Sequence, residues 1–283
     1  MTVLTDQELK QIDRANASGR TPVVFVHGLW LLPSSWDRWR EFFEDEGFTT
    51  VAPGWPDDPD TVQQARAHPE VFAKKSLGAI TDRYADAINR LARQPVVIGH
   101  SFGGVIAQKL AGLGLSRVTV AIDPAPFRGV LPLPRSSLKT AAPVLANPAN
   151  YTRSVALTFE QFNFGWTNAL PEEEARELYN TFHVAGSAVP LFQAATANLN
   201  PWSEDSVDTT SAARGPLLLI SGDRDNTSPW AIVSASYDRQ KQNPGVTEIV
   251  SIPDRGHSLT IDHGWKTVAD EALHFVVQYS GEK

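Results

Sequence analysis

Short apolar runs alternate with helical segments along most of this chain. Six runs rich in β-branched residues have the length of strands: 22–28, 48–53, 95–101, 117–123, 216–223 and 246–254. The middle four are almost continuously apolar, which is typical of strands buried on both faces of a parallel sheet. Residues 76–93 repeat apolar positions with the period of a helix, and helices are also expected at about 6–14, 103–112 and 265–279. This alternation predicts an α/β protein with a doubly wound, mostly parallel sheet of about six strands.

The stretch between about residues 124 and 214 interrupts the alternation. It contains no convincing strand, but it has prolines, many aromatic residues and helical patches such as 171–182. Because it is too long to be a loop of a compact domain, we expect a mostly helical insertion. The predicted division is a core formed by residues 1–128 and 214–283, with a helical cap at 129–213.

The composition excludes several classes of function. The chain has 283 residues, of which 42% are hydrophobic, and its net charge is −7 without a cluster of Lys or Arg, which argues against a nucleic-acid partner. It has no cysteine, so disulfides, thiolate metal sites and cysteine nucleophiles are excluded. The polar N-terminus lacks the apolar core of a signal peptide, and no stretch approaches the apolar length of a membrane span. We therefore expect a cytoplasmic protein with no membrane partner.

The sequence GHSFGG at 99–104 suggests covalent catalysis. Ser101 lies at the end of a predicted buried strand and directly before a predicted helix, between Gly99 and Gly103. Glycines at these two positions avoid Cβ clashes in a tight turn, and the helix directs its free N–H groups at the same place. In this setting the pattern G-x-S-x-G predicts a nucleophilic serine. The alternative is a glycine-rich turn in which the serine only caps the helix.

A nucleophilic serine needs a base, and the base needs an acid to orient it. Asp223 and Asp225 follow the fifth predicted strand, and His257 and His263 follow the last one. The order Ser, Asp, His suits strand ends that meet at one shared site. His257 is the preferred base because it is nearer the strand and follows Gly256, whereas His263 lies at the start of a helix. Both aspartates remain candidates for the acid at this point.

These motifs resemble the α/β-hydrolase superfamily, in particular its non-haem haloperoxidase and aryl-esterase branch and the small carboxylesterases and lactonases. The resemblance rests on HGLW at 27–30, GHSFGG at 99–104, GDRDNTSP at 222–229 and GH at 256–257. It extends over about 22–128 and 214–280 and leaves the insertion unassigned. The strand pair that usually begins this fold is missing from the N-terminus, so about six core strands are expected instead of eight.

The resemblance also implies roles for individual residues. In the family the acid falls three residues after a glycine and four before a proline, which selects Asp225 over Asp223. Asp123 is a third candidate, because some relatives carry the acid at the end of that strand. The backbone N–H groups of Leu29 and Phe102 are expected to bind the oxyanion.

Aromatic residues near these motifs provide candidates for the substrate pocket. The five candidates are Trp30, His100, Phe162, Trp166 and Trp230. Trp30 and Trp230 adjoin the oxyanion and acid loops, and either could instead be packed beneath the site. His27 is structural in most relatives and is not expected to be catalytic. The loop at 53–60 lacks the Pro-Gly-x-Gly pattern that is usual after the second strand.

The resemblance implies a serine hydrolase that cleaves small carboxylic esters or lactones through an acyl-enzyme. No metal or organic cofactor is expected. The same residues could serve a lyase, a carbon–carbon bond hydrolase or a perhydrolase. Serine at position 101 disfavours dehalogenases and epoxide hydrolases, whose relatives carry aspartate there. Some relatives are non-catalytic small-molecule receptors, in which damaged triads occur, so the three residue types found here favour an enzyme.

Overall fold

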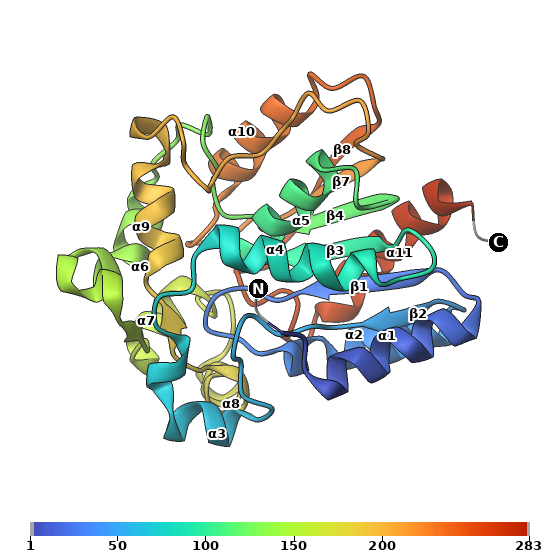
Figure 1. Cartoon of the computed structure of the whole chain (residues 1–283). Helices are drawn as coiled ribbons and strands as arrows, with labels where there is room; N and C mark the ends of the chain where they lie inside the picture. The colour runs from blue at the N-terminus through green and yellow to red at the C-terminus, as the bar shows by residue number, and fades with distance from the viewer. Residues whose placement is uncertain (1–2, 282–283) are drawn as a thin grey trace.

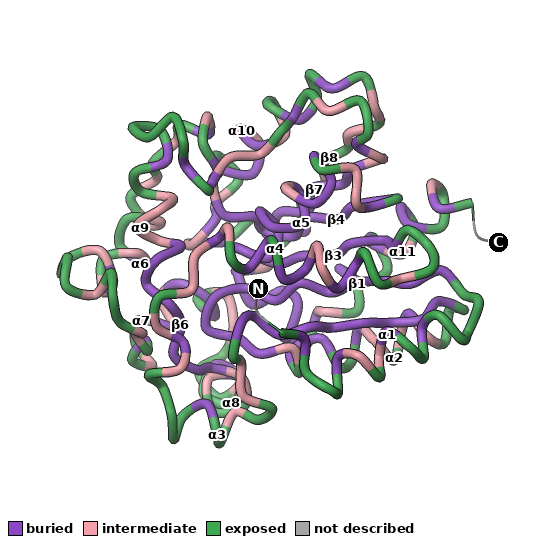
Figure 2. Tube along the Cα trace, in the orientation of Figure 1, coloured by how far each residue is buried: buried purple, intermediate pink, exposed green. Residues whose placement is uncertain are grey.

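A six-stranded parallel sheet forms the centre of the computed structural model, which describes residues 3–281. The strands are β1 (Pro22–Val26), β2 (Thr49–Val51), β3 (Val96–His100), β4 (Val118–Ile122), β7 (Leu217–Gly222) and β8 (Thr247–Ile252). Their order is β2-β1-β3-β4-β7-β8, and every neighbouring pair is parallel. The inner strands are buried throughout, whereas the edge strand β8 is partly exposed (Figure 2). The predicted strands and the α/β class are confirmed.

Helices cover both faces of this sheet (Figure 1). One face carries α1 (Asp6–Ser18), α4 (Leu77–Asn89), α5 (Phe102–Gly112) and α10 (Trp230–Gln240), and the other carries α2 (Asp37–Asp45) and α11 (Trp265–Ser280). Alternation along β1 explains why both faces are apolar: Val24 and Val26 pack on the first side, and Val23 and Phe25 on the second. The helices predicted at both ends of the chain, before β3 and after Ser101 are all present.

The insertion lies between β4 and β7. It contains α6 (Arg135–Leu145), α7 (Phe159–Gly165), α8 (Glu172–Phe182) and α9 (Val189–Thr196), with 3₁₀ turns at Pro148–Thr152 and Ala197–Leu199. These helices gather at one end of the sheet, on the left of Figure 1, near α3 (Val62–Ala67). The insertion also holds two short strands, β5 (Ser154–Val155) and β6 (Gly186–Ser187), which pair antiparallel apart from the central sheet. The expectation of a strand-free insertion was therefore wrong in this detail, because two-residue strands leave no alternating pattern.

The face of the sheet that carries α2 and α11 is filled by aromatic side chains. Phe25 of β1 contacts Trp36, in the 3₁₀ turn Pro33–Trp36, with 5.0 Å between ring centroids, and Phe43 at 5.7 Å. Trp39 is fully buried, and its indole N–H donates a hydrogen bond to the carbonyl oxygen of Thr260 at 2.9 Å. This bond joins α2 to the loop between β8 and α11, which also contains His257.

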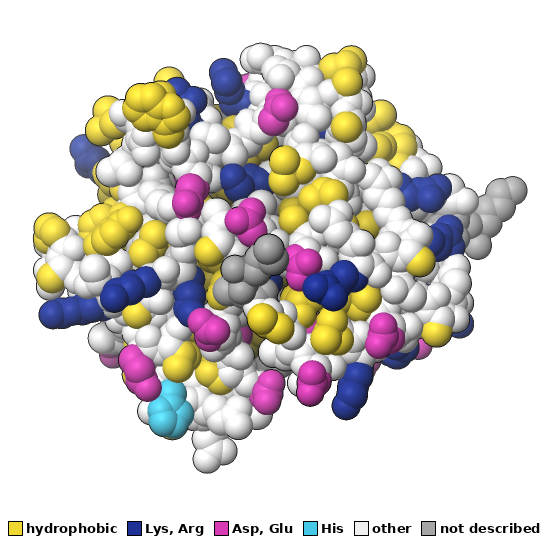
Figure 3. All heavy atoms as spheres, viewed as in Figure 1, with side chains coloured by type: hydrophobic (Ala, Val, Ile, Leu, Met, Phe, Trp, Pro, Cys, Tyr) yellow, Lys and Arg dark blue, Asp and Glu magenta, His cyan; other side chains and the backbone are white. Residues whose placement is uncertain are grey.

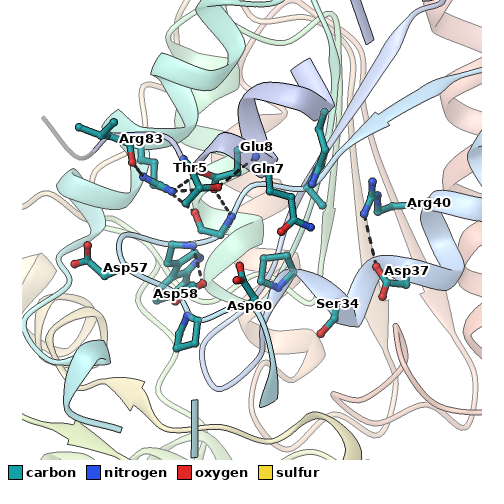
Figure 4. A pocket seen from close by; sticks show the side chains of 17 residues that line it. Thr5, Gln7, Glu8, Ser34, Asp37, Arg40, Asp57, Asp58, Asp60 and Arg83 are labelled. Atoms are coloured by element: carbon teal, nitrogen blue, oxygen red, sulfur yellow. Dashed lines mark hydrogen bonds and ion pairs between the residues drawn. The ribbon is translucent and has the colours of Figure 1, made fainter. Parts of the chain in front are cut away.

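A buried ion pair attaches the N-terminal helix to the core. Glu8 of α1 and Arg83 of α4 are both buried, and Nη2 of Arg83 donates a hydrogen bond to the Glu8 carboxylate at 2.6 Å. Figure 4 shows their side chains meeting beside Thr5, whose hydroxyl and the Glu8 carboxylate form a capping box at the start of α1. The pair forms part of the wall of a polar cavity of about 240 Å³. The pair holds α1 against α4, and separating the two helices would leave a buried charge uncompensated.

The surface combines mixed charge with local apolar exposure. On the face in Figure 3, acidic and basic side chains are interspersed, and hydrophobic groups gather on the left, over the insertion. The exposed large apolar residues of the insertion include Leu131, Leu133, Leu138, Leu199 and Trp202. Within residues 3–281, none of the helices combines the length and the apolarity needed to cross a bilayer.

The aromatic layer gives a stability prediction with a matched control. Replacing Trp39 by Ala should lower the free energy of unfolding by about 3–5 kcal/mol, since it empties a fully buried indole site and removes the bond to Thr260. Trp202 is 87% exposed, so Trp202→Ala should change stability by less than about 0.5 kcal/mol. Urea denaturation followed by circular dichroism measures both. Equal losses in the two variants would show that this layer does not carry the stability assigned to it.

Candidate active site

Ser101 occupies a strained turn between β3 and α5. Its backbone angles are φ 57° and ψ −123°, a conformation that non-glycine residues rarely adopt. A Cβ atom at Gly99 would lie 2.1 Å from the carbonyl oxygen of Gly103, and one at Gly103 would lie 2.1 Å from that of Val26. Both glycines are therefore required because backbone approaches backbone on each side of the turn.

The side chain of Ser101 does not cap the helix that follows it. The backbone N–H of Ser101 donates to the carbonyl of Ile122, and its own carbonyl accepts from Ala125, so the turn is bound to β4 and the segment after it. At the N-cap of α5 the hydroxyl makes no capping bond. Instead, Oγ lies 2.9 Å from Nε2 of His257. The structure thus does not support the alternative in which the serine is only a cap.

His257 and Asp225 complete a chain of hydrogen-bonding groups that begins at Ser101. Nδ1 of His257 lies 2.6 Å from Oδ2 of Asp225, and both side chains are fully buried. The other oxygen of Asp225 accepts the backbone N–H groups of Thr227 and Ser228 at 2.5 and 3.0 Å. These two donors hold the carboxylate in place. An ionised carboxylate can only accept hydrogen bonds, so Nδ1 of His257 must carry the proton that it donates to Asp225. Nε2 is then left to accept a proton from the Ser101 hydroxyl.

The other candidates for the base and the acid lie differently. His263 is exposed and contacts Glu174 of α8, with Nδ1 2.8 Å from the carboxylate. Asp223 is exposed at the end of β7. Asp123 is fully buried, and its Oδ1 accepts the backbone N–H of Gly222 at 2.8 Å. Of the three aspartates, Asp225 makes the direct contact with His257.

A neutral histidine and a tryptophan enclose His257. Nε2 of His100 lies 2.9 Å from the carbonyl oxygen of His257, so this nitrogen carries the proton. Burial lowers the pKa of His100 well below its usual range, and the neighbouring His257 ring lowers it further. Trp166 meets the His257 ring edge to face at 4.7 Å, and its carbonyl accepts the N–H of Ser258 at 3.0 Å. These contacts exclude water from the far side of the imidazole and hold its loop.

The loop at 27–30 approaches Ser101 closely and is attached to the insertion. A Cβ atom at Gly28 would lie 2.9 Å from Cβ of Ser101. Trp30 has φ 67°, its indole N–H donates to the carbonyl of Val155 in β5 at 2.9 Å, and its own carbonyl accepts the N–H of Val184 at 3.0 Å. The backbone beside Ser101 is therefore held by residues of the insertion.

His27 connects this loop to the loop at 53–60. Its Nδ1 lies 2.9 Å from the carbonyl of Gly28, its Nε2 lies 2.9 Å from Oδ2 of Asp58, and its ring stacks on Trp55. The sequence had suggested a structural His27 but not these partners. The sequence feature that could have indicated these partners is the loop at 53–60, which departs from the family pattern and contains both Asp58 and Trp55.

An apolar cavity of about 110 Å³ opens beside Ser101. Its walls include Trp30, Phe102, Leu138, Ala141, Leu191 and Ile232. Of the five aromatic and histidine candidates for the pocket, the structure brings Trp30 to this cavity. His100, Phe162 and Trp166 are buried behind His257, with the Phe162 and Trp166 rings stacked 5.5 Å apart. Trp230, at the start of α10, is 44% exposed and is not part of the cavity wall.

Comparison with known proteins identifies the family. The family model described as "Alpha/beta hydrolase family" matches residues 23–271. The chain belongs to this family. No curated protein sequence matches the chain. This membership supports a hydrolase and confirms the superfamily that the motifs had indicated.

Solved structures of several hydrolases share the fold. A monoacylglycerol lipase of Paleococcus ferrophilus has a TM-score of 0.62 and 19% identity, covering 91% of this chain and 94% of its own. A thermophilic esterase of Thermogutta terrifontis has a TM-score of 0.63 and 20% identity, covering 92% and 90%. A pyrethroid hydrolase of Sphingobium faniae has a TM-score of 0.60 and 21% identity, covering 93% and 99%. At these identities the likeness shows the shared hydrolase fold.

One group of side chains in this hydrolase has the composition of a metal site. Ligand atoms of Asp123, Asp225 and His257 all lie within 4.8 Å of one another. Both ring nitrogens of His257 and both oxygens of Asp225 already have hydrogen-bonding partners. A metal would have to displace these bonds, so we do not assign the group to a metal.

The contact between Asp225 and His257 gives a test of the acid. In Asp225→Asn the amide N–H₂ would face Nδ1 of His257 and favour the histidine tautomer that carries its proton on Nε2. A protonated Nε2 cannot accept the proton of the serine hydroxyl. We expect kcat to fall at least about a hundredfold, compared with about 10⁴-fold for the same change in a serine protease. The matched control Asp223→Asn changes an exposed side chain and should cost less than about tenfold. A greater loss in the control would reject Asp225 as the acid.

Proposed function

We propose that this protein is a serine hydrolase that cleaves small carboxylic esters or lactones through an acyl-enzyme. The observation that carries the proposal is the continuous contact from Ser101 Oγ through His257 to Asp225, with distances of 2.9 and 2.6 Å. These three side chains are buried beside an apolar cavity, as a site for an uncharged ester requires.

The first half of the proposed reaction forms the acyl-enzyme. Ser101 Oγ attacks the acyl carbon while Nε2 of His257 takes the hydroxyl proton. Asp225 stabilises the imidazolium that results and holds the ring in one tautomer. The tetrahedral intermediate then collapses, and His257 returns the proton to the departing alcohol oxygen. In the second half, water attacks the acyl-enzyme with His257 again as base, and Ser101 regains its proton.

The backbone N–H groups of Leu29 and Phe102 are the proposed donors to the oxyanion. Phe102 begins α5, so its N–H is one of the free donors at the N-terminus of that helix. The close approach of Gly28 to Ser101 supports a donor from the neighbouring Leu29. Donors fixed before the reaction are effective because they need no reorganisation when the negative charge develops.

The segment 129–213 is proposed as a cap that determines which esters enter. Leu138 and Ala141 come from α6, and Leu191 comes from α9, so the insertion supplies one side of the cavity. A cavity of about 110 Å³ with such walls suits one short apolar acyl or alcohol group.

The nucleophile is tested by labelling. A fluorophosphonate should label Ser101 covalently, and Ser101→Ala should abolish both the label and aryl-ester hydrolysis, since loss of a triad serine costs up to about 10⁶-fold in kcat. Mass spectrometry and a chromogenic ester assay measure the two effects. An Ala variant that keeps most of its activity would refute the proposal, and a wild-type protein that binds esters without turnover would favour a receptor.

The cap is tested by filling the cavity from α6. Ala141→Phe should lower kcat/KM for a butanoate ester at least about tenfold and for an acetate ester less than about threefold, because the added ring occupies space that the longer acyl chain needs. Ala142 is the next residue on the same helix but is exposed, so Ala142→Phe is the matched control and should leave both values unchanged. Equal losses for both esters in Ala141→Phe would place the acyl chain elsewhere.

A further inference from the structure

A second buried carboxyl lies against the proposed triad without a role in it. Asp123 follows β4 and is fully buried, and ligand atoms of Asp123, Asp225 and His257 lie within 4.8 Å of one another. Asp225 is held as an acceptor by His257 and two backbone N–H groups. Asp123 and Asp225 therefore bring two carboxyl groups together in a buried site. Ionising both would place two negative charges close together away from water, which is energetically unfavourable.

The two oxygens of Asp123 have different surroundings. Oδ1 accepts the N–H of Gly222 at 2.8 Å. Oδ2 is buried and receives no hydrogen bond. An ionised carboxylate oxygen in such a place would lack the donors that buried anions require, whereas a protonated oxygen needs only an acceptor. Both ring nitrogens of His257 are already engaged, so the acceptor that this group offers is the Asp225 carboxylate, an oxygen of which lies within 4.8 Å of one of Asp123.

We infer that Asp123 is a protonated carboxylic acid that donates a hydrogen bond to Asp225 and positions it toward His257. It acts through Asp225 and does not touch the reacting atoms, so it is a positioning residue. Its proton stays on Asp123 during the reaction, and a single negative charge, on Asp225, then faces the imidazolium. This inference rests on the proposed function for its kinetic consequence, but the protonation state does not depend on activity.

Other features agree with this assignment. Burial raises the pKa of Asp123 well above its usual range, the negative charge of Asp225 and a hydrogen bond with it raise it further, and the N–H of Gly222 and the hydroxyl of Ser221 lower it. The groups around Asp123 come from several elements: Ser221 and Asp225 from β7 and its loop, and His257 from the loop after β8. His100 of β3, whose ring centroid lies 4.7 Å from that of His257, is neutral because burial depresses its pKa.

Asp123 can be replaced by a group of the same shape that never ionises. Asn can accept from Gly222 with its oxygen and donate to Asp225 with its N–H₂, and Asn tolerates the left-handed φ of 39° at this position. Asp123→Asn should therefore fold and keep kcat within about threefold. Asp123→Gly also tolerates that φ but has no donor, so kcat should fall about 10- to 100-fold, the cost of one hydrogen bond to a charged group.

The pH dependence of kcat/KM separates positioning from a merely structural role. If Asp123 is already neutral, Asp123→Asn removes no charge and the acid limb of the profile should stay in place. If Asp123 were ionised, the same change would remove a negative charge near His257, and the limb would move to lower pH by at least about one unit. That shift, or failure of Asp123→Asn to fold, would overturn the inference.

Infrared spectroscopy tests the protonation state without using activity. Wild-type protein carrying ¹³C-labelled aspartate should show the C=O band of a protonated carboxylic acid at pH 7, and Asp123→Asn should lose it. Asp205 is another buried carboxyl whose pKa burial raises, so Asp205→Asn identifies its own band as a control. If no protonated band is lost in Asp123→Asn, the inference is wrong even in an active enzyme. If the band is lost but Ser101→Ala remains active, only the proposed function fails.

Discussion

The strained backbone of Ser101 is the constraint on which the rest of the site depends. A residue with φ 57° and ψ −123° costs about 1–3 kcal/mol, and it persists only where its surroundings leave no other arrangement. Here β3 is buried on both faces, the N–H of Ser101 is bound to β4, and Gly99 and Gly103 let the backbone pass itself at contact distance. The turn places the hydroxyl away from the helix it would otherwise cap and beside His257.

The surroundings of this turn link the parallel sheet to the insertion. Trp30 lies 125 residues before Val155, yet its indole is bonded to that carbonyl, and Val184 is bonded to Trp30 in return. The His257 loop is likewise attached to the carbonyl of Trp166, at the end of α7. Movement of the insertion would therefore displace the loop beside Ser101 and the loop of His257. If the insertion is the cap that we propose, substrate selection is mechanically connected to the geometry of Ser101 and His257.

The regular parts of this arrangement could be predicted from the sequence. Continuous apolar runs fixed the strands, and the glycine pattern around Ser101 located the turn, because both are local properties. The order of Ser, Asp and His along the chain did not choose among the three aspartates that follow strand ends. The family resemblance selected Asp225, and the fold shows that this aspartate meets Nδ1 of His257. Trp230 illustrates the same limit, since its position next to the acid loop did not reveal that it faces outward. The partners of His27 and the strand pair of the insertion depend on contacts between distant segments and leave no periodic signal.

Direct observation of an acylated serine during turnover tests the central claim most closely. Trypsin releases residues 94–109, QPVVIGHSFGGVIAQK, in which Ser101 is the one serine. Rapid quenching of the reaction with a p-nitrophenyl ester, followed by peptide mass spectrometry, should find the acyl group on Ser101 in an amount matching the initial burst of p-nitrophenol. Acyl mass on another peptide, or full turnover with Ser101 unmodified at every time point, would contradict the account.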